Sequence, residues 1–161
     1  QDELARELFL RLSDAPDECP KDVVYKDPKQ TAVAHPGEIP AALLDFARQA
    51  LEKALAEPLA LERALGETLS DPKPGVWFEP ADDFGLIENV RLNQRTRMLY
   101  DAQHIFINGE SYLAAGRDAE LMRQLADTRQ LSSAEVQQLS DDALQLLSSW
   151  VDAGWAHSTA G

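Results

Sequence analysis

The sequence lacks the features that mark secreted, membrane-spanning or disulfide-stabilised proteins. It has a single cysteine, Cys19, in 161 residues, so no internal disulfide can form and a reducing compartment is expected. No apolar run approaches the roughly 20 residues that a transmembrane helix needs. No basic and apolar leader of the kind found in signal peptides stands at the N-terminus. We therefore expect a cytoplasmic protein.

Positive charge is also scarce. The chain has 15 Lys and Arg residues against 28 Asp and Glu residues, which gives a net charge of −13. Such a surface repels phosphate backbones and anionic membranes, so we expect neither DNA nor a membrane as a partner. The same charge fits a basic protein partner, although solubility alone also explains it.

Motifs of catalysis and metal binding are missing as well. The three histidines are His35, His104 and His157. None of them stands in the H-x-D/E pairing of a two-histidine, one-carboxylate iron site or in an H-E-x-x-H motif. The neighbours Asp17 and Glu18 disfavour a reactive thiolate at Cys19. We expect no catalytic, cofactor-binding or metal-binding residue in this chain.

The first half of the sequence alternates between helical patterns and a proline-rich connector. Residues 2–12 have the leucine spacing of a short amphipathic helix. Four prolines then interrupt residues 13–39, which favours an extended connector. Two further helices are predicted at 41–57 and 59–69, with Pro58 between them. The Pro/Gly run that follows them, at 71–75, is the expected domain boundary.

These two predicted helices each carry one apolar face. Two helices so short cannot bury their apolar faces completely against each other. Each leucine left in water loses the roughly 1.5–3 kcal/mol of stabilisation that burial would give. We expect a second copy of the chain to cover these faces through two-fold pairing, and the alternative is that another domain of the same chain covers them. The predicted homodimer interface consists of Leu43, Leu44, Leu51, Leu55, Leu61, Leu65 and Leu69.

The second half combines short strands with three helices. Strands are predicted at 90–92, 96–100, 104–108 and around 111–113. Helices are predicted at 117–129, after Ser132, and at 141–153 with Ser140 as its cap. Asn108-Gly109 is a strong hairpin-turn signal because both residues tolerate positive φ. Ser132 with Glu135 forms a capping box. Strands followed by helices, the last two joined tightly, resemble a winged helix.

A winged helix suggests DNA binding, but the charges oppose it. The candidate recognition helix at 141–153 contains three aspartates and no Lys or Arg, which costs affinity for phosphates. The basic cluster of the strands is Arg91, Arg95 and Arg97. We interpret it as a solvated face paired with nearby acids, and the less favoured alternative is a phosphate-binding face. We expect no binding of duplex DNA.

The ordered landmarks resemble a known family, the bacterial JmjC/cupin-type ribosomal oxygenases. They are Asp27-Pro28, Ala34-His35-Pro36, Ile39-Pro40, the run Phe106 to Glu110, the helix pattern Leu121 to Asp127 and the segment Trp150 to Trp155. Together they are similar to the region that follows the catalytic domain in that family. The connector with its three proline motifs is the most distinctive part of the resemblance.

The resemblance implies an oxidoreductase whose catalytic part lies elsewhere. In that family an N-terminal cupin domain binds Fe(II) and 2-oxoglutarate and hydroxylates an arginine of a large-subunit ribosomal protein; dimerisation helices and a winged helix follow. The metal and 2-oxoglutarate ligands of the family have no matching positions here, so none is carried over. Because the chain starts at Gln1 inside a helical pattern, without an initiator methionine, we expect a piece of a longer protein.

The sequence thus predicts an α+β chain, mostly helical, from which the catalytic cupin domain is absent. Residues 1–75 are expected to form a connector and a helical dimerisation region, and residues 76–161 a winged-helix-like domain. The predicted function is the non-catalytic dimerisation and protein-binding region of a 2-oxoglutarate/Fe(II)-dependent dioxygenase, whose expected substrate is a basic ribosomal protein. The alternatives are a stand-alone protein-interaction module and, with less support, a winged-helix regulator that binds nucleic acid.

Overall fold

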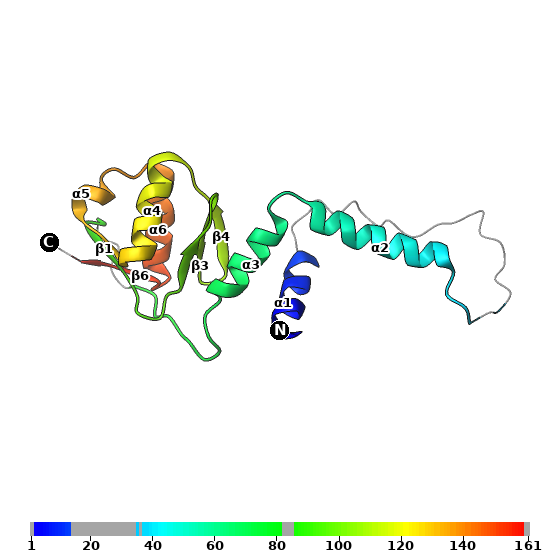
Figure 1. The fold of residues 1–161 in the computed structure, drawn as a ribbon. Helices are drawn as coiled ribbons and strands as arrows, with labels where there is room; N and C mark the ends of the chain where they lie inside the picture. The colour runs from blue at the N-terminus through cyan, green and yellow to red at the C-terminus, as the bar shows by residue number, and fades with distance from the viewer. Residues whose placement is uncertain (1, 14–34, 36, 82–85, 160–161) are drawn as a thin grey trace. The chain divides into compact units, whose positions relative to one another are not determined.

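The chain divides into two compact units. A computed structural model describes residues 2–13, 35, 37–81 and 86–159 (Figure 1). Contacts between Cα atoms separate Gln1–Ala64, here called the helical unit, from Leu65–Gly161, here called the winged unit. The division falls inside helix α3 (Ala60–Ser70), before the Pro/Gly run at 71–75 that we expected as the boundary. Cys19 and most of the predicted connector lie outside the described residues.

The helical unit contains α1 (Asp2–Ser13), α2 (Ala41–Ala56) and the first residues of α3. Pro40 is the residue before α2 rather than part of its first turn, with φ −60° and ψ 138°. Its fixed φ and missing N–H suit an entry into a helix. Between α2 and α3, Leu59 adopts a positive φ of 63°, which turns the chain after Pro58. The predicted helices therefore form, with ends shifted by at most one residue.

The strands of the winged unit form two small antiparallel sheets. In one, β1 (Asn89–Leu92) lies between β5 (Gln130–Leu131) and β6 (Ala156–Thr159). In the other, β2 (Met98–Tyr100), β3 (His104–Ile107) and β4 (Glu110–Leu113) follow one another as a meander. Asn108 and Gly109 join β3 to β4 with φ values of 48° and 89°, as the hairpin signal predicted.

The helices of the winged unit begin and end at the residues that cap them. They are α4 (Gly116–Thr128), α5 (Ser133–Val136) and α6 (Asp141–Asp152). The capping box before α5 is complete, with the Ser132 backbone N–H donating to Glu135 Oε2 at 2.7 Å. Ser140 Oγ accepts from the Ala143 N–H at 3.2 Å at the start of α6. Gly154, with φ 76°, follows that helix and permits the reversal into β6.

The core of the winged unit is built where α4 and α6 meet the strands (Figure 1). Its largest fully buried side chains include Ile107, Leu121, Leu125, Leu147 and Trp150. The Trp150 ring meets Tyr112 of β4 edge to face, with 5.7 Å between ring centroids. Residues predicted on the apolar stripes of these helices thus form one continuous core.

Two strands were not predicted, and one was predicted too long. Both β5 and β6 were missed, although Val90 pairs with Leu131 on one side and with Ser158 on the other. Strand β2 begins at Met98 and not at Thr96, because the chain turns where the Thr96 N–H donates to Asn93 O. The missed strands are two and four residues long, and neither contains the run of β-branched and aromatic residues that signals a strand.

The C-terminal half of α3 packs against the second sheet, which explains why the compact units divide within this helix. A Cβ atom at Gly66 would lie 2.2 Å from the Phe106 ring, so the helix approaches the sheet through a glycine. Ser70 Oγ accepts from the Gly109 N–H at 3.1 Å, at the turn between β3 and β4. Ser111 Oγ of β4 donates to Glu67 Oε1 at 2.5 Å.

Candidate functional site

The leucines predicted to form an interface are exposed in the chain. Their exposed fractions are Leu43 38%, Leu44 57%, Leu51 56%, Leu55 50%, Leu61 46%, Leu65 37% and Leu69 44%. Helix α2 has no buried residue at all. Leu65 and Leu69 belong to the winged unit, because the compact units divide within α3. Within each unit these leucines thus stay exposed, and their pairing with a second copy stays a prediction.

Helix α6, the candidate recognition helix, faces solvent with acidic and neutral side chains. It buries Ala143, Leu147, Trp150 and Val151 in the core. The described side chains on its exposed side include Asp141, Asp142, Gln145 and Asp152. A helix that presents carboxylates in this way opposes insertion between DNA phosphates. It offers complementary charge to a basic protein surface.

The histidines do not meet one another. His104 is buried, stacks on the Phe106 ring and has its Nδ1 3.0 Å from Asp101 Oδ2. His35 and His157 are exposed, the latter on β6. Over the part of the chain that the structure describes, no group of three or more His, Cys, Asp or Glu residues could hold a metal ion. The contacts of His104 identify it as a structural residue.

Asp101 stabilises the turn that carries His104. Burial tends to raise the pKa of its carboxyl group, but hydrogen bonds outweigh burial and hold that pKa below its ordinary value. The bonds come from the backbone N–H groups of Gln103 and His104, at 2.8 and 2.7 Å, and from the His104 ring. The predicted turn at 101–103 is therefore fixed by a charged acceptor.

The three arginines predicted on the strands do not pair with acids, which corrects our interpretation. Only Arg91 lies on a strand, because β1 ends at Leu92 and β2 begins at Met98. Arg95 Nη1 donates to the Trp77 carbonyl at 3.2 Å, and Arg97 Nη1 donates to the Asp71 carbonyl at 2.8 Å. Arg91 Nη2 donates to Gln130 Oε1 at 3.3 Å. Among the described residues, no carboxylate forms an ion pair with any of these three arginines. No ion pair therefore neutralises their charges in that part of the chain.

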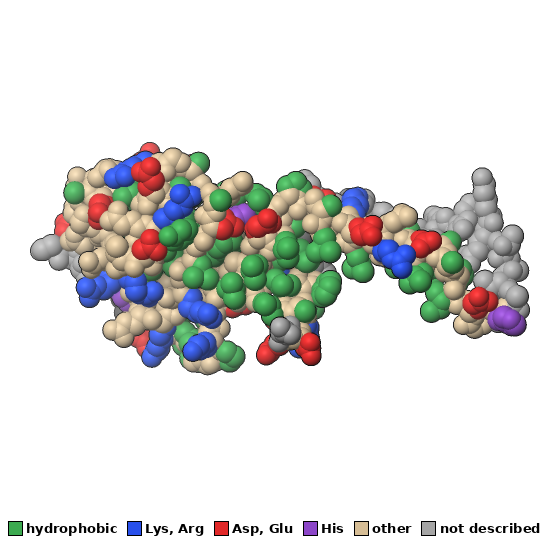
Figure 2. Space-filling model, in the orientation of Figure 1, with side chains coloured by type: hydrophobic (Ala, Val, Ile, Leu, Met, Phe, Trp, Pro, Cys, Tyr) green, Lys and Arg blue, Asp and Glu red, His purple; other side chains and the backbone are tan. Residues whose placement is uncertain are grey.

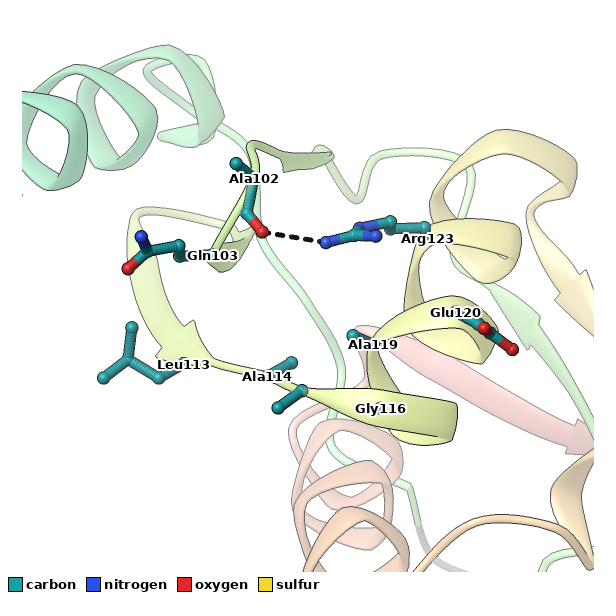
Figure 3. Close-up of a pocket in the computed structure, with 9 residues that line it drawn as sticks. Ala102, Gln103, Leu113, Ala114, Gly116, Ala119, Glu120 and Arg123 are labelled. Carbon is teal, nitrogen blue, oxygen red and sulfur yellow. Dashed lines mark hydrogen bonds between the residues drawn. The ribbon is translucent and has the colours of Figure 1, made fainter.

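A hollow of about 620 Å³ lies between the β2–β3 turn and the start of α4 (Figure 3). Its floor is made of small residues, Ala114, Ala115, Gly116 and Ala119. Arg123 Nη2 closes one side by donating to the Ala102 carbonyl at 3.0 Å. The lining does not bring an acid, a base and a nucleophile together, so it has no catalytic group arrangement. It could hold a small apolar side chain. Sequence reasoning missed it, because only folding brings the turn to the helix.

A membrane-spanning role finds no support in the helices. In the described ranges, none of them is long and apolar enough to cross a bilayer.

Comparison with known protein families gives one match over most of the chain. A family model described as a ROXA-like winged helix matches residues 49–157. The sequence matches none of the curated proteins with which it was compared.

Solved structures of similar fold include several of YcfD, a ribosomal oxygenase from Escherichia coli. One has a TM-score of 0.75 at 17% identity, covering 99% of this chain and 46% of that one. A YcfD complex with cobalt and succinic acid has a TM-score of 0.73 at 19% identity, covering 97% and 45%. A complex with cobalt and 2-oxoglutarate has a TM-score of 0.72 at 20% identity, covering 94% and 45%. The chain thus spans less than half the length of YcfD and shares the fold of that part.

Proposed function

The chain belongs to the ROXA-like winged-helix family, and from this premise we propose that it is the non-catalytic dimerisation and protein-binding region of a 2-oxoglutarate/Fe(II)-dependent oxygenase that resembles ribosomal protein arginine hydroxylases. The proposal is supported by a shared fold along 99% of this chain but only 46% of a ribosomal oxygenase. The oxygenase chemistry would come from a JmjC/cupin domain of the parent protein, with Fe(II) and 2-oxoglutarate. The residues described here supply no cluster that fits the metal, and we assign them no step of the reaction.

The observation that carries the dimerisation role is the uncovered leucine surface. Among the described residues of the helical unit, no side chain larger than alanine is buried. Covering one exposed leucine stabilises the complex by up to roughly 1.5–3 kcal/mol. Several leucines together therefore outweigh a weak opposing effect such as screened charge repulsion. A surface of this kind marks an interaction site rather than an ordinary solvated helix.

The spacing of the leucines favours a second copy as the covering surface. Leu51 and Leu55 follow one another at four residues, as do Leu61, Leu65 and Leu69, so each set lies along one side of its helix. Two-fold pairing can cover both copies with a single patch. The net charge of −13 opposes association, but at physiological salt exposed charges act over only about 8 Å. We therefore propose a homodimer that uses α2 and α3.

Sedimentation of the 161-residue chain at micromolar concentration tests this proposal. We expect a species of twice the 17.8 kDa of one chain. Leu51→Asp or Leu55→Asp should yield the monomer, because each places a charge within the leucine surface. Gln49→Asp adds the same charge to an exposed site of α2, two positions before Leu51 and thus on the opposite side of the helix. It is the matched control and should leave the dimer intact. A 17.8 kDa species alone for the unmutated chain would contradict the proposal.

The acidic surface supports a basic ribosomal protein as the partner of the parent enzyme in the cytoplasm. Opposite charges steer such an encounter, and the exposed aspartates of α6 would contribute to it. The same carboxylates argue against duplex DNA and anionic membranes as partners. Binding of a basic ribosomal-protein peptide should weaken as salt is added, and an affinity independent of salt would count against this role.

A further inference from the structure

Positive charge is concentrated in one stretch of the winged unit. Residues 89–97 contain three arginines and no acidic residue, in a chain whose acids outnumber its basic residues by 28 to 15. Figure 2 shows Lys and Arg side chains gathered along one side of the winged unit. A local cluster can act independently of a distant opposite charge, because salt screens exposed charges beyond about 8 Å.

The arginines of this stretch are held in place by neutral acceptors and not by ion pairs. Arg95 and Arg97 each donate from Nη1 to a backbone carbonyl of the 71–77 segment. A guanidinium group has five N–H donors, so each arginine keeps donors for an external acceptor. Because a carbonyl is neutral, these bonds orient the side chains without cancelling their charge. All three arginines, Arg91 included, are exposed.

An exposed tryptophan stands beside them. Trp77 has 78% of its surface exposed, and its own carbonyl accepts the bond from Arg95. Its neighbour Phe78 packs edge to face on Trp155 at 6.4 Å, which anchors the segment while Trp77 stays in solvent. An exposed indole, on a residue whose backbone carbonyl binds an arginine, offers an aromatic platform for stacking.

From these contacts we propose that Trp77, Arg95 and Arg97, extended by Arg91 on β1, form a binding surface for single-stranded nucleic acid. The arginines would contact successive phosphates, and Trp77 would stack on one base. A duplex hides its base faces, so it could not use Trp77, and the acidic α6 would repel it. An acidic polypeptide would use the arginines but has no base to stack, so the exposed indole favours a nucleic acid over it.

Fluorescence anisotropy of a labelled 12-nucleotide oligouridylate with the 161-residue chain tests this inference. We expect binding whose log–log salt slope is about −2, the value for three phosphate contacts at 0.7 each. Trp77→Ala should weaken binding about tenfold, the equivalent of stacking one base, and Trp77→Phe should retain most of it. No binding up to about 100 µM, the weak end of non-specific nucleic-acid affinity, would overturn the inference.

A pair of double variants separates this surface from charge in general. Arg95→Gln/Arg97→Gln should abolish most of the binding and flatten the salt slope. Arg117→Gln/Arg123→Gln removes the same charge from α4, where Arg117 pairs with Glu120 at 2.8 Å, and should leave binding nearly unchanged. Equal loss in both pairs, or equally tight binding of polyglutamate, would overturn the inference. Circular dichroism verifies the fold of each variant, and sedimentation tests the proposed dimer separately, since neither double variant touches its leucines.

Discussion

The winged unit and the helical unit place their apolar side chains in opposite environments. In the winged unit the side chains of α4, α6 and the strands are packed together, and Leu121, Leu125 and Leu147 have no exposed surface. In the helical unit the leucines of α2 are half exposed and α2 buries nothing. Both units have amphipathic helices of similar composition, so amphipathicity alone does not tell which helix builds a core.

The difference indicates how each unit is stabilised. The strands and capped helices of the winged unit pack around a core of their own, as expected of a domain that is stable independently. Helices as short as α1 and α2 are marginal in water without tertiary packing. The helical unit therefore depends on a covering surface, which is the physical basis of the proposed dimer.

The strongest test of this comparison is the same substitution in both units. Leu147→Ala removes a side chain with 0% exposure in α6 and should lower the free energy of unfolding by about 2–5 kcal/mol, since it leaves a cavity. Leu10→Ala removes one with 47% exposure in α1 and should change it by less than about 0.5 kcal/mol. Urea unfolding followed by circular dichroism measures both. Equal effects would show that the packing contrast between the units is wrong.

Two glycines, one in each unit, give a second and smaller contrast in the effect of substitution on stability. Gly154 has φ 76°, and a Cβ there would lie 2.0 Å from the Glu79 carbonyl oxygen, so Gly154→Ala should cost on the order of 1–3 kcal/mol. Gly37 has no atom within 4 Å of such a Cβ, so Gly37→Ala should be neutral or slightly stabilising. Thermal unfolding of the two variants provides the measurement. A Gly154→Ala protein as stable as the parent would contradict the close approach at this position.

The smallest expected effect is a pH dependence of the winged unit. The depressed pKa of Asp101 stabilises the folded state above the unfolded carboxyl pKa of about 4, and this contribution is lost as pH falls through the folded pKa. Its size should stay below about 1 kcal/mol, because the side chain is 32% exposed and solvent screens it. Asp101→Asn should flatten the stability profile below pH 4, measured by urea unfolding. If the stability of the variant falls with pH as steeply as that of the parent, other carboxylates cause the acid sensitivity.

Local chemistry made much of the winged unit predictable from sequence. The Ser132–Glu135 capping box, the Ser140 cap and the Asn108-Gly109 turn each depend on residues no more than three positions apart. Helix faces were also predictable, since Leu147 and Trp150 repeat at helical spacing. For the candidate surfaces, the sequence identified the leucines and the arginines but not their surroundings.

The local elements could therefore be predicted from the residues alone, because their signals lie within one turn or one hairpin. Which elements meet became clear only from the folded chain. Strands β5 and β6 exist because β1, about 40 and 67 positions earlier, supplies their hydrogen-bond partners, as Val90 does for Leu131 and Arg91 for His157. Likewise, the sequence gives no sign that Gly66 is special. In the structure the Phe106 ring occupies the space that a side chain at Gly66 would need. Pairings over such separations leave no periodic trace in the sequence, because they depend on how the whole chain packs.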